Sequence, residues 1–485
     1  MLGLRNSRLL QTAAYIDGQW LESAHKFAVY NPANGQAIAQ VSETTAAQTE
    51  HAIVAAKGAQ LHWRQLSANE RCRLLRRWHE LIIANQDDLA RLLTLEQGKP
   101  LAEAKGEIHY GAAFIEWFAE EGKRLYGDTI AAPGADKRIT VIKQPVGVVS
   151  AITPWNFPNA MIARKAAAAL AAGCTFVVKP SPLTPLSALA LAELAQQAGI
   201  PAGVFNVVVA EQAQAIGEVL TQHSDVAKFT FTGSTQVGKL LSAQCASGVK
   251  RVSMELGGNA PFIVFDDADI EAAVAGVMAA KFRNAGQTCV SVNRIYVHRD
   301  VASAFQQQLL QQTANLTVGD GLDSRTNIGP LISTQAKAQI IDWVQQSLDM
   351  GAKLALGQIP AKDDCQFLSP CVLTDVSETM PVMCNEVFGP IASISVFDTE
   401  QQVIALANAT EYGLAAYFYS RDIGRIYRVS EALEFGMVGI NEGIISNAAA
   451  PFGGVKQSGH GREGSKYGLD DYTDIKYLCL GGIDS

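Results

Sequence analysis

Residues 146–179 read VGVVSAITPWNFPNAMIARKAAAALAAGCTFVVK, and this stretch predicts a strand, a helix and a second strand. The strands are expected at 146–152 and 175–179, with the Ala-rich helix at 159–172 between them. Two more strands are predicted at 204–209 and 228–232, and Pro185 and Gly199 open and close the helix that precedes them. Alternation at this spacing is typical of a mostly parallel, doubly wound α/β sheet. Nucleotides bind at the carboxyl ends of the strands in such sheets.

The rest of the chain is organised around this sheet. Residues 69–99 and 102–126 have helical periodicity, and a second alternating series begins with a strand at 261–265, a helix at 269–281 and a strand at 295–298. A chain of this length is expected to form more than one domain. We expect a dinucleotide-binding domain of residues 1–126 and 144–256 and a catalytic α/β domain of residues 257–460. Strand patterns at 127–143 and 467–480 lie outside both cores. We therefore expect 127–143 and 461–485 to form oligomerisation strands of a homodimer or homotetramer.

Composition and charge exclude several classes of protein. The 485-residue chain has a formal net charge of −8 and 48% hydrophobic residues, as in soluble globular proteins. An acidic chain without a basic stripe argues against a nucleic-acid partner. The sequence shows no export signal and no apolar run of membrane-spanning length, so we expect a cytoplasmic protein without a membrane partner. Its eight cysteines show no zinc-binding spacing, and we expect no metal.

Two loops carry reactive side chains. Cys289 ends NAGQTC (284–289), among small and turn-forming residues where a thiol is accessible and the thiolate is favoured. Glu255 stands in MELGGN (254–259), at a sharp break where a carboxylate can act as a general base toward a thiol or a water. Each has an ordinary alternative when taken alone. Free cysteines are usually buried structural residues, and this Glu can be a helix-end surface residue.

Three further loops add polar groups. PWNFP (154–158) is rigid and follows a strand, so Asn156 either offers an amide to an oxyanion or simply packs the loop. FTGSTQVG (231–238) opens a helix whose N-terminal amides suit a phosphate, although Thr235 breaks the G-x-G-x-x-G pattern. In EVFGP (386–390), Glu386 can bind sugar hydroxyls or be an unremarkable turn residue.

Together and in this order, PWNFP, FTGS, ELGG, GQTC and E-x-F-G-P resemble the aldehyde dehydrogenase superfamily over essentially the whole chain. The resemblance implies that superfamily's α/β fold, with a Rossmann-type cofactor domain, an α/β catalytic domain and a small oligomerisation arm. It implies that Cys289 is the nucleophile and Glu255 the general base, with Asn156 and the Cys289 amide as the oxyanion hole. Lys179 and Glu386 resemble the ligands of the two riboses. The implied cofactor contacts are Trp155, Asn156, Lys179, Ser181, Pro182, Gly233, Ser234, Leu256, Glu386 and Phe388.

The chemistry of aldehyde oxidation explains these residue types. An aldehyde has no leaving group, so hydride loss requires a tetrahedral adduct first, and a thiolate supplies it. Hydride transfer to NAD(P) leaves a thioester, which a water activated by Glu255 hydrolyses. Relatives that acylate coenzyme A resolve the thioester with a thiol and do not need that base. Glu255 therefore favours a hydrolytic enzyme.

Residues 147–170, 251–298 and 441–477 resemble the succinate-semialdehyde dehydrogenase subfamily. In that subfamily, residues at the positions of Arg164, Arg283 and Ser446 clamp the distal carboxylate of the substrate, and Phe452 is placed with them. A guanidinium fork suits a carboxylate. The subfamily's Glu-Val pair is replaced within Ala448–Ala450, and one methylene is worth only about 1–3 kcal/mol in a pocket. Glutarate semialdehyde is therefore an alternative substrate. Uncharged or phosphorylated aldehydes are the alternative if both arginines are ordinary ion-paired or surface residues.

Two departures concern regulation and cofactor choice. Many relatives carry a second cysteine two positions after the nucleophile; Ser291 stands there, so we expect no redox disulfide. NAD-preferring relatives often have a Glu at the position of Pro182. Without that carboxylate, the side chains of Lys179 and Ser181 can bind the 2′-phosphate of NADP. We therefore expect NADP to be preferred and NAD tolerated.

Two rival interpretations belong to other classes. A cofactor-free cysteine hydrolase or acyltransferase would leave FTGS and E-x-F-G-P without a role. A catalytically inactive relative is disfavoured because Cys289 and Glu255 are both present.

Overall fold

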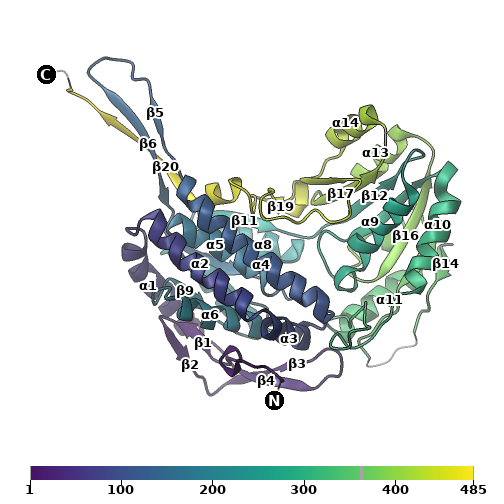
Figure 1. Cartoon of the computed structure of the whole chain (residues 1–485), viewed down its shortest axis with the longest axis horizontal. Coiled ribbons are helices and arrows are strands. Elements are labelled where there is room, and N and C mark those ends of the chain that lie inside the picture. The colour runs from purple at the N-terminus through teal and green to yellow at the C-terminus, as the bar shows by residue number, and fades with distance from the viewer. Residues whose placement is uncertain (1, 361–364, 484–485) are drawn as a thin grey trace.

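The computed structural model describes residues 2–360 and 365–483, in which two large sheets lie beside each other (Figure 1). The first sheet has the order β19-β11-β10-β7-β8-β9-β1-β2, and β11, β10, β7, β8 and β9 run parallel. This confirms the predicted doubly wound α/β class. Its strands are β1 (Ala14–Ile16), β2 (Gln19–Leu21), β7 (Val148–Ile152), β8 (Thr175–Lys179), β9 (Phe205–Val207), β10 (Val226–Thr232), β11 (Arg251–Glu255) and β19 (Gly459–His460).

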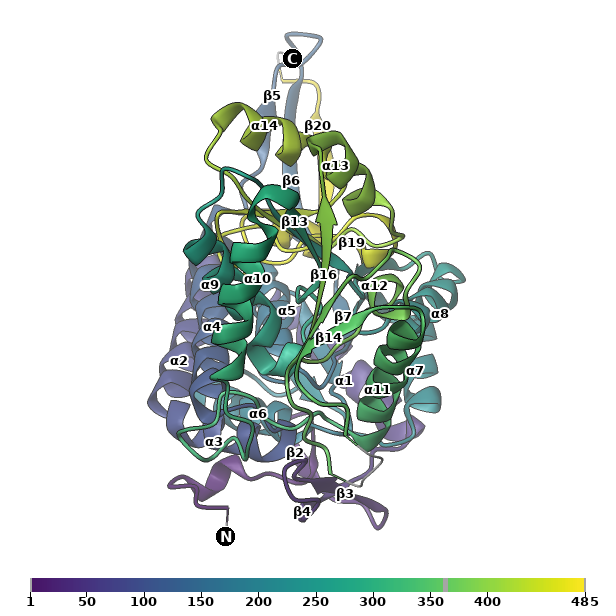
Figure 2. The same cartoon turned by 90° about the vertical axis from the view of Figure 1, so that its right-hand side faces the viewer.

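Helices cover both faces of the first sheet (Figures 1 and 2). On one face, α5 (Ala160–Ala172) and α6 (Leu186–Ala198) pack on the strands beneath an outer layer of α2 (Ala68–Ala84), α3 (Gln86–Gln97) and α4 (Leu101–Glu121). The opposite face carries α1 (Ala46–Trp63), α7 (Ala213–Gln222) and α8 (Thr235–Ala246). Every residue of α5 is buried, because the helix lies between the sheet and the outer layer. Its Ala-rich sequence permits this close packing.

The second sheet has the order β14-β15-β16-β13-β12-β17-β18, in which only β14 is antiparallel to its neighbour among the described strands. Its strands are β12 (Ala260–Val264), β13 (Val292–His298), β14 (Lys353–Leu356), β15 (Cys371–Thr374), β16 (Ile391–Phe397), β17 (Ala415–Tyr419) and β18 (Met437–Ile440). The helices around it are α9 (Ile270–Phe282), α10 (Arg299–Ala314), α11 (Thr334–Asp349), α12 (Pro381–Cys384), α13 (Glu400–Asn408) and α14 (Ile423–Ala432).

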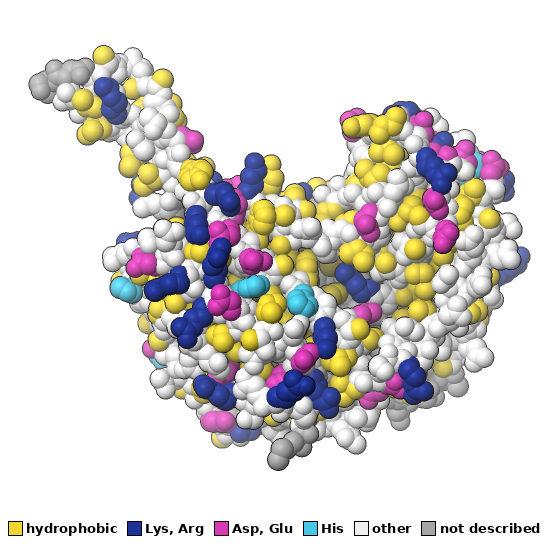
Figure 3. Space-filling model, in the orientation of Figure 1, with side chains coloured by type: hydrophobic (Ala, Val, Ile, Leu, Met, Phe, Trp, Pro, Cys, Tyr) yellow, Lys and Arg dark blue, Asp and Glu magenta, His cyan; other side chains and the backbone are white. Residues whose placement is uncertain are grey.

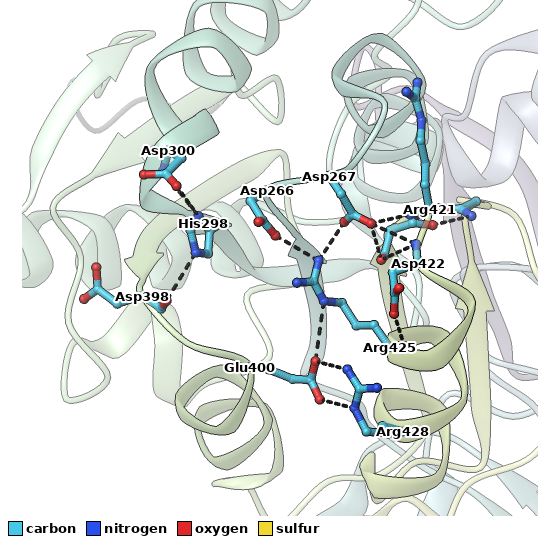
Figure 4. A network of polar contacts seen from close by, with 12 residues as sticks. Asp266, Asp267, His298, Asp300, Asp398, Glu400, Arg421, Asp422, Arg425 and Arg428 are labelled. Carbon is cyan, nitrogen blue, oxygen red and sulfur yellow. Dashed lines mark hydrogen bonds and ion pairs between the residues drawn. The ribbon is translucent and has the colours of Figure 1, made fainter.

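A network of charged groups joins the loop after β12 to α13 and α14 (Figure 4). Arg425 lies 2.8 Å from both Asp266 and Asp267 and 3.4 Å from Glu400. Asp267 also accepts hydrogen bonds from Ser420 Oγ and from the amides of residues 421 and 422, at 2.8–2.9 Å. Several donors on one carboxylate stabilise its ionised form, so this network fixes the end of β17 against β12.

A three-stranded antiparallel arm projects away from both sheets (Figure 1). It consists of β5 (Asp128–Ile130), β6 (Arg138–Pro145) and β20 (Thr473–Leu480), in the order β20-β6-β5. Ile475, Tyr477 and Leu480 are each more than half exposed, at 73%, 61% and 64%. The arm therefore presents apolar side chains to its surroundings (Figure 3).

The structure corrects several sequence-based boundaries. Residues 467–472, expected as strand, form a 3₁₀ helix whose Leu469 and Tyr472 are buried in the first core. The helical region 69–97 breaks at Asn85, whose ψ of 15° interrupts the helix. The N-terminal region also contains β1–β4, with β3 (Lys26–Tyr30) paired to β4 (Ala37–Ser42). The sequence did not predict these strands, because they are short and lack a strong alternating pattern. Within 257–460, assigned to the second domain, β19 pairs with β11 of the first sheet, because the chain returns there at Gly459.

The strand order places the functional loops. β8 and β10 lie on opposite sides of β7, so the chain switches direction in the sheet between β7 and β10. Ligands bind at such switch points, beyond the carboxyl ends of the strands. PWNFP follows β7 and FTGS extends β10, whereas ELGG leads into β12 and GQTC precedes β13. Carboxyl ends of the first sheet thus meet amino ends of the second. None of the helices within the described ranges is both long and apolar enough to cross a membrane.

Candidate active site

A cavity of about 240 Å³ lies where the two sheets meet. It is lined by the loops after β7 and β10 on one side and by those before β12, β13 and β16 on the other. The predicted residues that line it are Trp155, Asn156, Gly233, Ser234, Leu256, Cys289, Glu386 and Phe388. The predicted residues outside its lining are Arg164, Lys179, Ser181, Pro182, Glu255, Arg283, Ser446 and Phe452. The five loops therefore converge on one site.

The loop before Cys289 has an unusual backbone. Asn284, Ala285 and Gly286 have φ values of 52°, 55° and 76°, in the left-handed region. Hydrogen bonds hold this turn, since the Asn284 amide donates to Glu103 at 2.7 Å and the Gln287 side chain accepts from the Ile332 amide at 2.9 Å. A Cβ on Gly286 would lie 2.2 Å from the Gly389 carbonyl oxygen. Close packing and hydrogen bonds therefore hold this strained backbone in place and fix the position of the Cys289 thiol.

The Cys289 thiol is half-buried and faces charges of both signs. Burial raises its pKa to about 12, and the carboxylates of Glu386 and Glu255 add to the rise. The guanidinium groups of Arg164 and Arg283 oppose it. In the protein without ligands burial therefore favours the protonated thiol, which corrects the expectation from the local sequence that the thiolate is favoured. Forming a thiolate requires a base or an added positive charge.

Asn156 is anchored through its backbone. Its carbonyl oxygen accepts from Lys99 Nζ at 2.7 Å and from Asn284 Nδ2 at 3.1 Å, and Lys99 forms a fully buried ion pair with Glu107 at 2.6 Å. The Asn156 side-chain nitrogen donates to the Gln287 carbonyl at 3.1 Å. Because an amide nitrogen carries two hydrogens, this bond leaves one donor for the cavity.

Glu255 ends β11 and is 2% exposed. Neither carboxylate oxygen has a hydrogen-bond partner among residues 2–360 and 365–483. Burial raises the pKa of this carboxyl well above its ordinary value, and the nearby Glu463 carboxylate raises it further. Glu463 itself forms ion pairs with Arg164 and Lys165. Glu255 is therefore a buried carboxyl next to charged groups, an arrangement that suits a general base.

Polar and aromatic groups form the other half of the cavity. Glu386 accepts from the Gly258 amide at 3.0 Å, and burial raises its pKa to about 7. The rings of Trp155 and Phe388 meet edge to face, with centroids 5.6 Å apart. Ser234 caps α8 at the cavity wall. A helix N-terminus and a carboxylate on one wall suit the phosphate and sugar of a nucleotide.

Lys179 is the last residue of β8, in the first sheet. It is 2% exposed, donates to the Pro180 carbonyl at 3.3 Å, and burial lowers its pKa to about 8. Ser181 and Pro182 follow it on the surface side. The Glu43 carboxylate lies close enough to Lys179 to raise that pKa, a neighbour that sequence reasoning did not identify.

The two predicted substrate arginines differ in their surroundings. Arg164 is buried, lies over the Phe452 ring at 4.5 Å and pairs with Glu463. Arg283 lies over the Phe157 ring at 5.5 Å, and its Nε is buried without a hydrogen-bond partner in the described part of the chain. Arg164 therefore pairs with a protein carboxylate through Nε, but its Nη1 and Nη2 are buried without a hydrogen-bond partner in the described part of the chain. Both arginines thus keep a donor that no described residue accepts from.

The model of the aldehyde dehydrogenase family matches residues 20–478. The chain belongs to the aldehyde dehydrogenase family. It is 57% identical to the NADP(+) succinate-semialdehyde dehydrogenase GabD of Escherichia coli K12, over 99% of each chain. It is 55% identical to a glutarate-semialdehyde dehydrogenase of Pseudomonas aeruginosa, over 99% of this chain and all of the relative, and 56% identical to a 3-sulfolactaldehyde dehydrogenase of Pseudomonas putida, over the full length of both.

Membership of the aldehyde dehydrogenase family identifies this chain as an NAD(P)-dependent enzyme that acts on small aldehydes. Family membership disfavours the alternative of a cofactor-free cysteine hydrolase. Such an enzyme would have no ligand for the cavity wall formed by Glu386 and the N-terminus of α8. Three polar residues near the site were not identified from the sequence. Glu463 lies in GREGSKYG (461–468), within the 441–477 stretch that resembles the subfamily, whereas Lys99 lies in the short connection between α3 and α4 and Tyr110 lies in α4, and neither carried a local signal.

Proposed function

We propose that this aldehyde dehydrogenase oxidises succinate semialdehyde to succinate through a thiohemiacetal and then a thioester on Cys289. The observation that carries this substrate class is Arg283, whose Nε atom is buried and lacks a partner within the described ranges and whose charge acts on Cys289. A cation near the nucleophile suits an aldehyde with an anion at its other end. Three relatives act, by their names, on aldehydes of that kind.

Each residue has a defined part in the proposed steps. Cys289 passes its proton to solvent water and its sulfur adds to the aldehyde carbon, while Asn156 Nδ2 and the Cys289 amide hold the new oxyanion. A nicotinamide cofactor, when bound, would accept the hydride. When the adduct loses hydride, the C–O bond becomes a carbonyl again and a thioester remains. Glu255 then takes a proton from water as the water oxygen attacks the thioester carbon. The C–S bond breaks, the acid leaves, and Glu255 returns the proton to the sulfur, which restores the thiol.

The residues of the site fit a dinucleotide. Lys179 is a buried cation that donates a hydrogen bond to the Pro180 carbonyl, and Glu386 presents a carboxylate to the cavity. These groups would hold the two riboses, with the α8 N-terminus near the phosphates. For cofactor choice we propose NADP, with NAD also accepted. Pro182 places no carboxylate against a 2′-phosphate, and the Escherichia coli relative is named for NADP(+).

Two other substrates have specific support. Glutarate semialdehyde is one methylene longer, and the loop at 447–450 is built from small residues, with Asn447 turning back onto the Ala449 amide at 2.8 Å. In 3-sulfolactaldehyde, a sulfonate replaces the carboxylate at the same distance from the aldehyde. We expect the order of kcat/KM to be succinate semialdehyde, then the other two anionic aldehydes, then butanal.

The proposal also covers assembly and location. The exposed apolar side chains of the arm support a homo-oligomer, with the arm as oligomerisation strands and the sheets as cofactor and catalytic domains. A cytoplasmic location is consistent with a catalytic thiol that must stay reduced.

The test is a panel of kcat/KM values for these four aldehydes, each with NADP and with NAD, followed by absorbance of the reduced cofactor. Succinate semialdehyde with NADP should give the highest value. If butanal matches it, the proposed substrate class is wrong. If neither cofactor is reduced with any aldehyde, the proposed reaction is wrong.

A further inference from the structure

Tyr110 of α4 reaches the substrate side of the site from the outer helix layer. Its ring packs edge to face on Phe114, with centroids 4.9 Å apart, and contacts the small cluster of Phe157, Ala160 and Met161. Phe157 lies in the PWNFP loop after β7, and Met161 lies in the first turn of α5 and lines the cavity. Two aromatic contacts hold the ring in one orientation, so the place of its hydroxyl is fixed.

The Tyr110 hydroxyl is buried and has no hydrogen-bond partner of good geometry among the residues that the structure describes. An unpaired buried hydroxyl costs free energy, so native structures rarely keep one without a ligand or water. The groups around it are donors: Arg164, Arg283 and Ser446 all lie close enough to act on it electrostatically or through their side chains. The Arg283 Nε in the same region is likewise without a partner in 2–360 and 365–483.

A group of donors that lacks acceptors is complementary to an anion. Carboxylate and sulfonate oxygens offer several lone pairs, and each can accept from more than one donor. The neighbouring carboxylate, Glu463, is already taken up by Arg164 and Lys165. A bound anionic group would supply the acceptor that these donors lack.

We propose that Tyr110 determines substrate specificity by donating a hydrogen bond from its hydroxyl to the distal anionic group of the aldehyde, beside Arg283 and Ser446. This inference rests on the proposed function, because it assumes that the substrate carries such a group. Burial raises the pKa of Tyr110, so the hydroxyl keeps its proton through the neutral and mildly alkaline range. It acts as a neutral, directional donor that adds to the charge of the arginines.

The matched variant is Tyr110→Phe, which keeps the ring and removes the hydroxyl. We expect kcat/KM for succinate semialdehyde to fall by about 10- to 150-fold, the value of a hydrogen bond to a charged group, mainly through a higher KM. The value for butanal should stay within about twofold. The thermal midpoint should be unchanged or higher, because the variant removes an unpaired buried group. Tyr126→Phe, at a 71% exposed tyrosine, is the control.

The outcomes separate this inference from the proposed function. If wild-type enzyme does not prefer succinate semialdehyde over butanal, the proposed function fails first. If the preference holds and Tyr110→Phe leaves it unchanged, the assignment of Tyr110 is wrong. Equal losses for both aldehydes would show a structural role and would also overturn it. A loss confined to anionic aldehydes supports it.

Discussion

Replacing Arg283 with methionine removes one guanidinium while keeping a long, flexible side chain. Arg283 follows α9, lies over Phe157 at 5.5 Å and has a buried Nε with no partner in the described ranges. A hydrogen bond to a charged group is worth about 1.5–3 kcal/mol. At 1.36 kcal/mol per factor of ten, kcat/KM for succinate semialdehyde should fall by about 10- to 150-fold.

The same change also acts on the nucleophile, since Arg283 lowers the pKa of Cys289. Its loss raises that pKa and slows every aldehyde alike. The ratio of kcat/KM for succinate semialdehyde to that for butanal cancels this shared effect and isolates the contact with the carboxylate. The assay is initial-rate formation of reduced cofactor with both aldehydes. Arg325→Met, at an exposed arginine paired with Asp323, is the control. An unchanged ratio in Arg283→Met would refute the carboxylate contact.

Four further predictions address the base, the cofactor and the fold. Glu255→Gln should release one equivalent of reduced cofactor quickly and then stall, because hydrolysis of the thioester loses its base; a full steady-state rate in rapid-quench experiments would contradict this. Since burial raises the pKa of Glu255 and a base must be unprotonated, the wild-type hydrolysis rate should rise with pH through a pKa above the ordinary 4.5, and a pH profile of kcat checks it. Pro182→Glu should lower kcat/KM for NADP relative to NAD by about 10- to 100-fold through repulsion of the 2′-phosphate, as paired cofactor kinetics would show. Asp267→Asn should cost about 1–3 kcal/mol of stability by weakening the network of Figure 4. Hydrogen bonds lower the pKa of Asp267, so its contribution is present at neutral pH and is lost as pH falls through that lowered pKa; urea unfolding of both proteins at neutral and acid pH should show the difference shrinking on acidification.

Sequence patterns located the site because its loops directly follow or precede strands. PWNFP and FTGS sit at carboxyl strand ends, and GQTC and E-x-F-G-P sit before strands of the second sheet, so convergence followed from topology. The family resemblance was confirmed by the family match and the relatives. The roles of the single residues stay proposals that the variants above test.

The sequence could not show contacts between distant segments. The ion pairs of Glu463 with Arg164 and Lys165 join residues about 300 positions apart. They show that Arg164 binds a protein carboxylate through Nε in addition to the donors it keeps at Nη1 and Nη2. Glu43 reaches Lys179 from a loop before α1, far from the motif that predicted the cofactor site. Tyr110 occupies an ordinary helical position, so only the packing of α4 against the PWNFP loop brings it to the site.

The most direct test of the central claim is the mass of the enzyme trapped during turnover. Glu255→Gln mixed with succinate semialdehyde and NADP, quenched in acid and digested, should yield a peptide that contains Cys289 and carries one succinyl group. The same experiment with Cys289→Ala should yield neither the modified peptide nor reduced cofactor. If Cys289→Ala still reduces the cofactor, or if the succinyl group is found on another residue, catalysis through a thioester on Cys289 is contradicted.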